Sequence, residues 1–259
     1  MKLLQHFDRA NTSDYILYRL KKGHWSHLIN KLHEDFRQCY ITDEVLEELS
    51  KKAGITKCDF LEKYILPDDP TIKSGDFGEL LCYYAVIENF ENKGFVLFGP
   101  KKWRWKDNRN VAAPGSDAIL FYVADSKKPT QKDILLTVES KMKAIKTNVH
   151  RTQDAIDGAM KDKKTRMAKT LSWLEEKYAK EGDEKNRRFV ERFKDPATFG
   201  DYNKMFKAVA VIDSTCEKDE IEKKLRNDEE ITVIIFSLED LKKAYENTRL
   251  NIIKSVYAS

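Results

Sequence analysis

The sequence predicts an α/β fold in which helices flank a mixed β-sheet, preceded by a mainly helical N-terminal segment. Two observations lead to this prediction: short apolar runs with strand character recur along the chain, and segments with helical periodicity alternate with them. A length of 259 residues provides a core that needs no disulfide or metal for stability. The runs that indicate strands are 95–105, 117–124, 133–141, 206–213 and 231–237. We therefore expect a sheet covered on both faces.

The first 70 residues read as a short extended opening followed by helices. Apolar residues in 41–55 recur at helical spacing, with Thr42 or Asp43 as the N-cap and Gly54 as the stop. Residues 66–76 combine prolines, a glycine and small polar residues, which indicates a linker. We therefore divide the chain into a helical segment at 1–70, for partner docking or regulation, and a second domain at 71–259.

The second domain is expected to open with a helix over 75–94, with Asp76 as its N-cap and Glu79 in its first turn. Of the strands that follow, 117–124 is apolar on both faces, so we expect it to be central. A long amphipathic helix is expected from about Asn148 to Tyr178. Two further helices are expected at 217–227 and 238–250, alternating with the last two strands.

Composition limits the class of protein. Charged residues make up 35% of the chain, yet the net charge is only +4, which permits nucleic-acid binding without arguing for it. The four cysteines are widely spaced and read as buried free thiols of a reducing compartment. No signal peptide or membrane-length apolar run occurs, so we expect a soluble, cytoplasmic protein with no membrane partner.

Charged residues at the end of the strand at 133–141 indicate chemistry. Side chains alternate along a strand, so Glu139 and Lys141 point the same way. An exposed ion pair of little energetic consequence is the simpler explanation. However, Asp117 starts the preceding strand after a Pro-Gly turn, and two carboxylates supply the hard oxygen donors that Mg²⁺ or Mn²⁺ prefers. A neighbouring lysine can stabilise negative charge on an attacked phosphate. Glu79 is a third acid, or simply a favourable charge near a helix N-terminus.

The order of these residues resembles that of the PD-(D/E)xK, or restriction-endonuclease-like, nucleases. The pieces are "GDFGE", "GSDAILF" and "VESK", followed by a helix that contains Gln153. With the helical N-terminal segment, they most closely resemble the HamA family of nuclease subunits in Hachiman anti-phage defence. One departure is Ser116, which stands where the superfamily motif has proline.

The resemblance implies a restriction-endonuclease-like core with a four-stranded mixed sheet. It implies that Asp117, Glu139 and the main-chain carbonyl of Ser140 hold Mg²⁺ (or Mn²⁺). Lys141 would orient or activate the attacking water, and Glu79 would reach the metal directly or through water. Gln153 would lie near the scissile phosphate.

Two basic stretches are candidates for DNA contact. In 101–106, Trp103 and Trp105 alternate with basic residues, which suits either base stacking and phosphate contact or a core with a charged edge. Five basic residues between Lys161 and Lys169 suit either phosphate contact or the solvated face of a helix.

The sequence therefore predicts a metal-dependent deoxyribonuclease whose substrate is DNA rather than a small molecule. The resemblance further implies a helicase partner subunit that restrains this activity. Two alternatives remain open at this point. One is a DNA-binding or scaffold subunit with a degenerate site, and the other is a solitary restriction or repair endonuclease.

Overall fold

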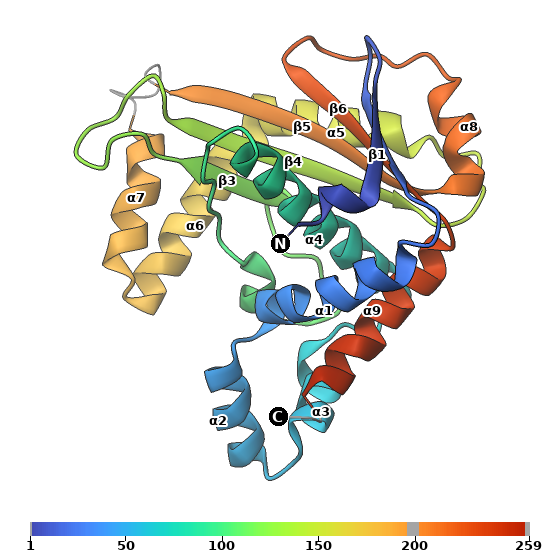
Figure 1. Cartoon of the computed structure of the whole chain (residues 1–259). Helices are drawn as coiled ribbons and strands as arrows, with labels where there is room; N and C mark the ends of the chain where they lie inside the picture. Colours follow the sequence, from blue (N-terminus) through green and yellow to red (C-terminus); the bar gives the residue numbers. More distant parts are fainter. Residues whose placement is uncertain (1, 196–201, 257–259) are drawn as a thin grey trace.

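Residues 2–195 and 202–256, which the computed structural model describes, form a six-stranded mixed sheet flanked by helices (Figure 1). The strands are β1 (Phe7–Asn11), β2 (Ile16–Leu20), β3 (Ala118–Tyr122), β4 (Ile134–Lys143), β5 (Asn203–Asp213) and β6 (Ile231–Leu238). They lie in the order β1-β2-β6-β5-β4-β3. Strands β2, β6, β5 and β4 run parallel to one another, while β1 and β3 are antiparallel to their neighbours. The predicted α/β class with a mixed sheet is confirmed.

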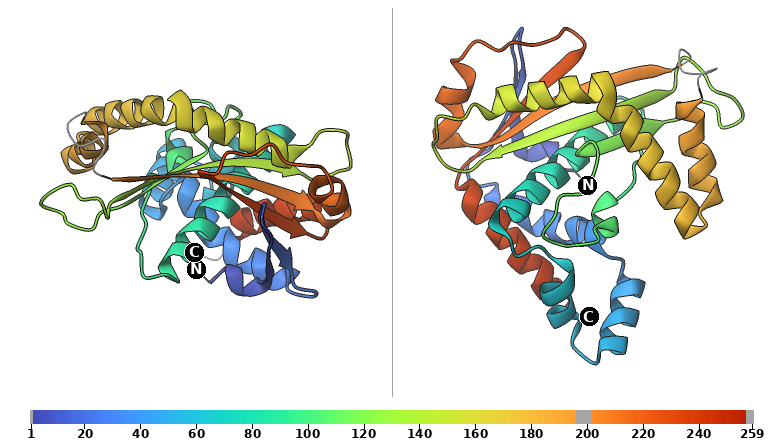
Figure 2. Two further views of the ribbon diagram at one scale, coloured as in Figure 1. Left: turned by 90° about the horizontal axis from the view of Figure 1, so that it is seen from above. Right: turned by 180° about the vertical axis from the view of Figure 1, so that it is seen from behind.

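Helices cover both faces of the sheet, as the view from above shows (Figure 2, left). On one face lie α1 (Trp25–Tyr40), α4 (Pro70–Glu91) and α9 (Leu241–Ser255). The other face carries α5 (Arg151–Lys161), the π-helical turn η4 (Asp162–Arg166) and α6 (Met167–Glu181). Because successive side chains of β4 point to opposite faces of the sheet, the strand packs against both helical layers. Leu136 and Val138 join the core on the α4 face, and Leu135 packs on the α5 face.

The remaining elements are shorter. The α-helices are α2 (Asp43–Ala53), α3 (Lys57–Phe60), α7 (Glu184–Lys194) and α8 (Glu217–Ile221). Single 3₁₀ or π turns are η1 (Leu4–His6), η2 (Leu61–Ile65), η3 (Lys102–Trp105) and η5 (Ser214–Cys216). All four cysteines are free and buried, as predicted. Among the described residues, no helix combines the length and apolar character needed to cross a membrane.

The N-terminal segment contributes to the same sheet as the rest of the chain. The hairpin of β1 and β2 joins it through β2, whose Tyr18 is the register partner of Phe236 on β6. The expected helix at 41–55 is present as α2, with Thr42 as N-cap and Gly54 as C-cap. Residues 1–70 thus supply two strands to the common sheet. A functional boundary near residue 70 remains a prediction.

The helix α4 begins earlier than expected. Asp69 is its N-cap, accepting hydrogen bonds from the backbone N–H groups of Thr71 and Ile72, and Pro70 occupies the first turn. The expectations of a linker through residue 76 and of Asp76 as the cap were wrong, because proline is compatible with a first helical turn. Asp76 is instead buried in the helix, where Lys106 Nζ lies 2.6 Å from Oδ1.

Strand β3 corrects the expectation of a central strand at 117–124, because β3 is the last strand of the sheet order in the described residues. Its apolar character on both faces has another cause. Ala118 and Leu120 face the α4 core, whereas Phe121 packs against Phe189 and Phe193 of α7, a helix that was not predicted.

Two other expectations also fail. Residues 95–105 form no strand, since only an isolated bridge from Phe98 to Phe121 precedes η3. The helix expected at 217–227 ends at Ile221. The four neighbouring strands β6, β5, β4 and β3 agree with the four-stranded mixed core that the resemblance implies, and β1 and β2 extend the sheet to six strands in the described part of the chain. The expected long helix is present, interrupted by the η4 turn.

Replacing Asp69 by alanine should destabilise the protein by about 1 kcal/mol, because two N–H groups at the start of α4 lose their acceptor. Urea unfolding would measure the change. Asp219→Ala is the matched control, since it removes an exposed carboxylate inside α8. Equal effects of the two substitutions would show that the cap contributes nothing.

Candidate functional site

The register of β3 and β4 places Asp117 opposite Glu139. Ala118, the first residue of β3, is the partner of Val138, so β4 continues past the start of β3 as far as Lys143. Asp117 Oδ2 accepts a hydrogen bond of 2.8 Å from the backbone N–H of Ser140. This carboxylate thus occupies the edge of β4 that β3 leaves unpaired. Asp117 is thereby fixed beside the Glu139-Ser140-Lys141 step.

Glu139 is almost completely buried, with 2% of its surface exposed, and faces α5 at Gly158. Lys141 Nζ donates to its Oε1 at 2.5 Å, and the Arg166 guanidinium donates to its Oε2. Burial raises the pKa of Glu139 and the Asp117 carboxylate raises it further, against the opposite effect of the two cations. Glu139 and Lys141 therefore do share one side of the strand, as predicted, but they form a largely buried cluster rather than an exposed ion pair.

Arg166 reaches Glu139 from the π-helical turn η4. Its Nε donates to Asp162 Oδ1 at 2.5 Å, and the Ser116 hydroxyl donates to the same oxygen at 2.8 Å. The backbone N–H of Ser116 donates to the Thr170 hydroxyl at 3.0 Å. Ser116, at the position of the motif's proline, therefore ties the approach to β3 to the helical layer. In the sequence, Arg166 is recognisable only as part of a basic run. Its position in a π turn is a structural signal, because such turns often occur at functional sites.

Lys141 is partly accessible, with 32% of its side chain exposed. Its Nζ lies 3.3 Å from the Ser140 carbonyl oxygen. Burial lowers the pKa of Lys141, but Asp117 and Glu139 together outweigh that effect, so the pKa is raised overall. In this arrangement the side chain is an ammonium ion at neutral pH.

Glu79 approaches from α4. Trp103 Nε1 donates to its Oε2 at 3.1 Å, and Lys102 Nζ lies 3.8 Å from the same oxygen. Lys102 also donates to the Ser116 carbonyl at 2.7 Å, which connects Glu79 to the loop before Asp117. Burial raises the pKa of Glu79 to about 8, with Lys102 opposing the shift and Asp117 adding to it. Lys102 is a site residue that the sequence analysis placed only in an aromatic-basic stretch.

Gln153 lies apart from this hydrogen-bond network. Its amide Nε2 donates to Asp157 at 2.9 Å and to the Arg226 carbonyl at 3.1 Å, while its Oε1 accepts from the Arg226 N–H. These bonds secure the connection into β6. A role near the scissile phosphate remains a prediction for Gln153.

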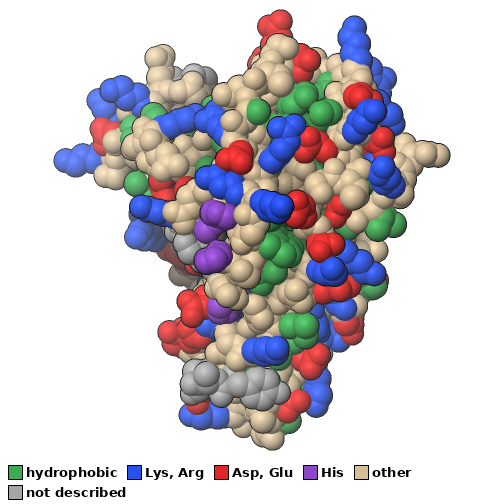
Figure 3. Space-filling view, turned by 45° about the vertical axis from the view of Figure 1, so that its right-hand side comes forward, with side chains coloured by type: hydrophobic (Ala, Val, Ile, Leu, Met, Phe, Trp, Pro, Cys, Tyr) green, Lys and Arg blue, Asp and Glu red, His purple; other side chains and the backbone are tan. Residues whose placement is uncertain are grey.

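The two basic stretches have mixed surroundings. Trp103 is buried against Tyr83, and Trp105 packs on Trp173, so both indoles have neighbours within the protein. In the second stretch Lys163 pairs with Asp228 at 2.9 Å. Its exposed members are Lys161, Lys164 and Lys169. On the face shown in Figure 3, basic and acidic side chains are interspersed.

The donor chemistry of the cluster fits a hard divalent cation that keeps several waters. Within residues 2–195 and 202–256, no three His, Cys, Asp or Glu side chains are grouped as metal ligands. A site here would therefore combine the carboxylates of Asp117 and Glu139 with the Ser140 carbonyl. Mg²⁺ is commonly bound by one or two carboxylates, its remaining positions filled by water.

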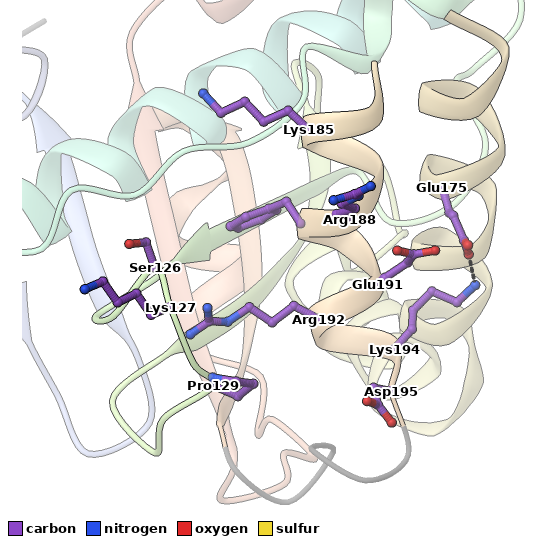
Figure 4. Close-up of a pocket in the computed structure, with 11 residues that line it drawn as sticks. Ser126, Lys127, Pro129, Glu175, Lys185, Arg188, Glu191, Arg192, Lys194 and Asp195 are labelled. Carbon is purple, nitrogen blue, oxygen red and sulfur yellow. Dashed lines mark hydrogen bonds and ion pairs between the residues drawn. The ribbon is translucent and has the colours of Figure 1, made fainter. Parts of the chain in front are cut away.

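A surface cavity of about 750 Å³ lies elsewhere, between α7 and the loop from β3 to β4 (Figure 4). Both charge types line it: Arg192 pairs with Asp133, and Lys194 pairs with Glu175. None of the predicted site residues lines this cavity. The size of this cavity alone does not indicate that it is the catalytic site.

Gly158→Ala should displace Glu139 and destabilise the protein by about 1–3 kcal/mol, because the new methyl group would overlap the Glu139 carboxyl group. Gly75→Ala is the matched control, since a methyl group on this α4 glycine meets no atom within 4 Å. We expect the control to be neutral or slightly stabilising. Chemical denaturation measures both, and a Gly158→Ala protein as stable as the control would contradict the tight packing.

Glu79 should make stability depend on pH. Its pKa is about 8 in the folded protein against an ordinary 4.5, so the folded form keeps a proton that the unfolded form releases between these values. This contribution is complete below pH 4.5 and is lost as the pH rises through 8, with a slope of at most about 1.4 kcal/mol per pH unit. Without divalent metal, Glu79→Gln should therefore gain stability relative to wild type as the pH rises from 5 to about 8. Urea unfolding at several pH values tests this, with exposed Glu48→Gln as control, and parallel pH profiles for wild type and Glu79→Gln would refute it.

Comparison with known proteins identifies the family. The sequence profile of the HamA family matches residues 4–250, which include every site residue described above. A search of curated proteins found no match. HamA proteins are associated with Hachiman anti-phage defence. Because the match covers nearly the whole chain, this protein belongs to the HamA family.

Proposed function

We propose that this HamA-family protein is a divalent-metal-dependent deoxyribonuclease, the effector of a defence complex that acts with a helicase subunit. One observation carries the proposal. Asp117, Glu139, the Ser140 carbonyl and Lys141 meet where β4 extends past the start of β3. Two carboxylates, a carbonyl oxygen and an ammonium group are the components of metal-assisted phosphodiester hydrolysis.

Asp117, Glu139 and the Ser140 carbonyl would hold Mg²⁺ (or Mn²⁺), with Glu79 bound directly or through water. When bound, such an ion withdraws charge from the phosphate and makes a neighbouring water easier to deprotonate. Asp117 uses Oδ2 for the Ser140 N–H, and this bond holds the carboxylate in position. Arg166 holds Glu139 from the η4 side and fixes its orientation.

Lys141 acts in this proposal as a cation rather than as a base. Because Asp117 and Glu139 keep its amine protonated, it is suited to position water and to stabilise negative charge on the phosphate. Its partly exposed ammonium can reach a substrate while remaining beside Glu139.

Family membership supports a defence role in the cytoplasm, and the surface supports dependence on a partner. The net charge of +4 is small for a protein that binds DNA unaided. In residues 1–70, α2 and α3 extend away from the sheet (Figure 1), and nearby Val45 and Tyr64 are exposed by 44% and 59%. This segment remains our candidate for docking the helicase.

A second candidate function is a DNA-binding subunit without catalysis. The observation that favours it is the pairing of both Glu139 oxygens with cations, which would also satisfy a purely structural carboxylate. A solitary restriction or repair endonuclease is the third candidate, and it predicts full activity without a partner.

Glu139→Gln and Lys141→Met should each reduce Mg²⁺-dependent cleavage of plasmid DNA by at least about 100-fold. The assay is run with and without the helicase, and exposed Glu48→Gln is the control. Both site variants remove charge while retaining side-chain length, so circular dichroism should confirm that they fold. Variants as active as wild type would exclude the assigned site.

Calorimetric titration with Mn²⁺ separates catalysis from scaffolding. Wild type should bind Mn²⁺, and Asp117→Asn should bind it much more weakly. DNA binding without Mn²⁺ binding or cleavage would favour the scaffold function. Equal cleavage with and without the helicase would favour the solitary endonuclease.

A further inference from the structure

A buried lysine on the other face of the sheet has no carboxylate partner in the described structure. Lys207 of β5 is 8% exposed, and its ammonium donates to the Thr232 hydroxyl of β6 at 2.7 Å. Buried lysines normally pair with acids. Lys143 on neighbouring β4 does so, through Glu220 at 2.8 Å. The positive charge of Lys207 is therefore not balanced in the same way.

Lys207 lines a cavity of about 190 Å³ between the β1–β2 hairpin, the sheet and the C-terminal half of α4. Arg9 and Lys93 also line it, and no aspartate or glutamate does. Asn89 and Thr232 add an amide and a hydroxyl group. The remaining wall is apolar: Leu4, Ile16, Tyr18, Ala85, Val86, Phe90, Met205, Ile234 and Phe236.

The electrostatics of the cavity favour an anion. Burial, and to a lesser extent the charge of Lys93, lowers the pKa of Lys207 to about 8. The nearby acid Glu88 is already occupied, since its Oε2 accepts hydrogen bonds from the backbone N–H groups of Leu3 and Leu4. An anionic ligand would therefore lie near three cationic side chains, while the Glu88 carboxylate is hydrogen-bonded to the backbone.

We propose that this cavity binds the terminal phosphate group of a phosphate monoester. A phosphate dianion suits three cations and two neutral hydrogen-bonding groups better than a single carboxylate charge does. The apolar wall accommodates the organic part. The ligand is a free small molecule or the 5′-phosphorylated end of a DNA strand, which share this chemistry.

This site is separate from the proposed nuclease site. Lys207 lies on the α4 face of the sheet, whereas Glu139 faces α5. The helices α4 and α5 cover opposite faces of the sheet (Figure 2). The cations come from β1, the turn after α4 and β5, so a bound phosphate would join the N-terminal hairpin to the central sheet and to the end of α4. Such a ligand would couple occupancy of the cavity to the position of the N-terminal segment.

The test is calorimetric titration of the full chain with phenyl phosphate, in EDTA so that no cleavage occurs. Lys207→Met keeps the length of the side chain and removes the unpaired charge, so it should fold with an undiminished melting temperature. Lys93→Met changes an exposed residue at the cavity, and Lys242→Met on α9 is the exposed control. Benzoate serves as the carboxylate comparison.

We expect phenyl phosphate to bind wild type and Lys242→Met equally, and Lys207→Met at least about tenfold more weakly. Lys93→Met should weaken binding by a smaller factor, and Glu139→Gln should leave it unchanged. No binding to wild type, or equal binding to the Lys207 and Lys93 variants, would overturn the proposal. Benzoate bound as tightly as phenyl phosphate would overturn the assignment of a phosphate.

Two oligonucleotides that differ only in a 5′-phosphate or 5′-hydroxyl identify the source of the ligand. A Lys207-dependent preference for the phosphorylated strand would support a DNA end as the ligand. Equal binding of both strands, with phenyl phosphate still dependent on Lys207, would support a free phosphate monoester.

Discussion

The hydrogen bond from the Ser140 N–H to Asp117 is the constraint on which the candidate site depends. Strand β3 starts opposite Val138, so the following residues of β4 need other partners on that edge. Asp117 supplies one, and it is brought close to Glu139 and Lys141 in doing so. Its position depends in turn on Ser116, whose backbone and side chain are held by Thr170 and Asp162. The edge of β4 that β3 leaves unpaired thus brings Asp117 next to Glu139 and Lys141.

Acidic groups outnumber basic groups around that bond. The acids of the cluster are Glu79, Asp117, Glu139 and Asp162, and the cations close to them are Lys102, Lys141 and Arg166. Burial raises the pKa of Glu79, Glu139 and Asp162, and Asp117 adds to each shift. Carboxylates held at raised pKa values are poorly satisfied by their protein partners alone. This imbalance, rather than the presence of acids as such, is the physical reason to regard the cluster as functional.

The sequence predicted what depends on local pattern and missed what depends on distant partners. Alternation placed Glu139 and Lys141 on the face opposite Val138, and the turn before β3 placed Asp117 beside them. By contrast, Arg166 reaches Glu139 only because η4 departs from α-helical spacing, and no periodicity in its basic stretch indicates this. The edge position of β3 was missed because this edge strand is covered on both faces, by the α4 core and by α7, so that it has the apolar pattern expected of a central strand. The start of α4 was missed because Asp69-Pro70 also occurs in linkers.

Two lysines of the same sheet have pKa values that their surroundings shift in opposite directions. Lys141 lies between carboxylates and its pKa is raised, whereas Lys207 lies among cations and apolar groups and its pKa is lowered. Neither difference is visible in the sequence, where both lysines belong to largely apolar strands. The carboxylates around the first lysine favour its protonated form, whereas an anion bound beside the second would raise its lowered pKa. The two proposals thus place a cation site on one face of the sheet and an anion site on the other. The family match includes residues on both faces of the sheet, so it does not by itself indicate which face binds a ligand.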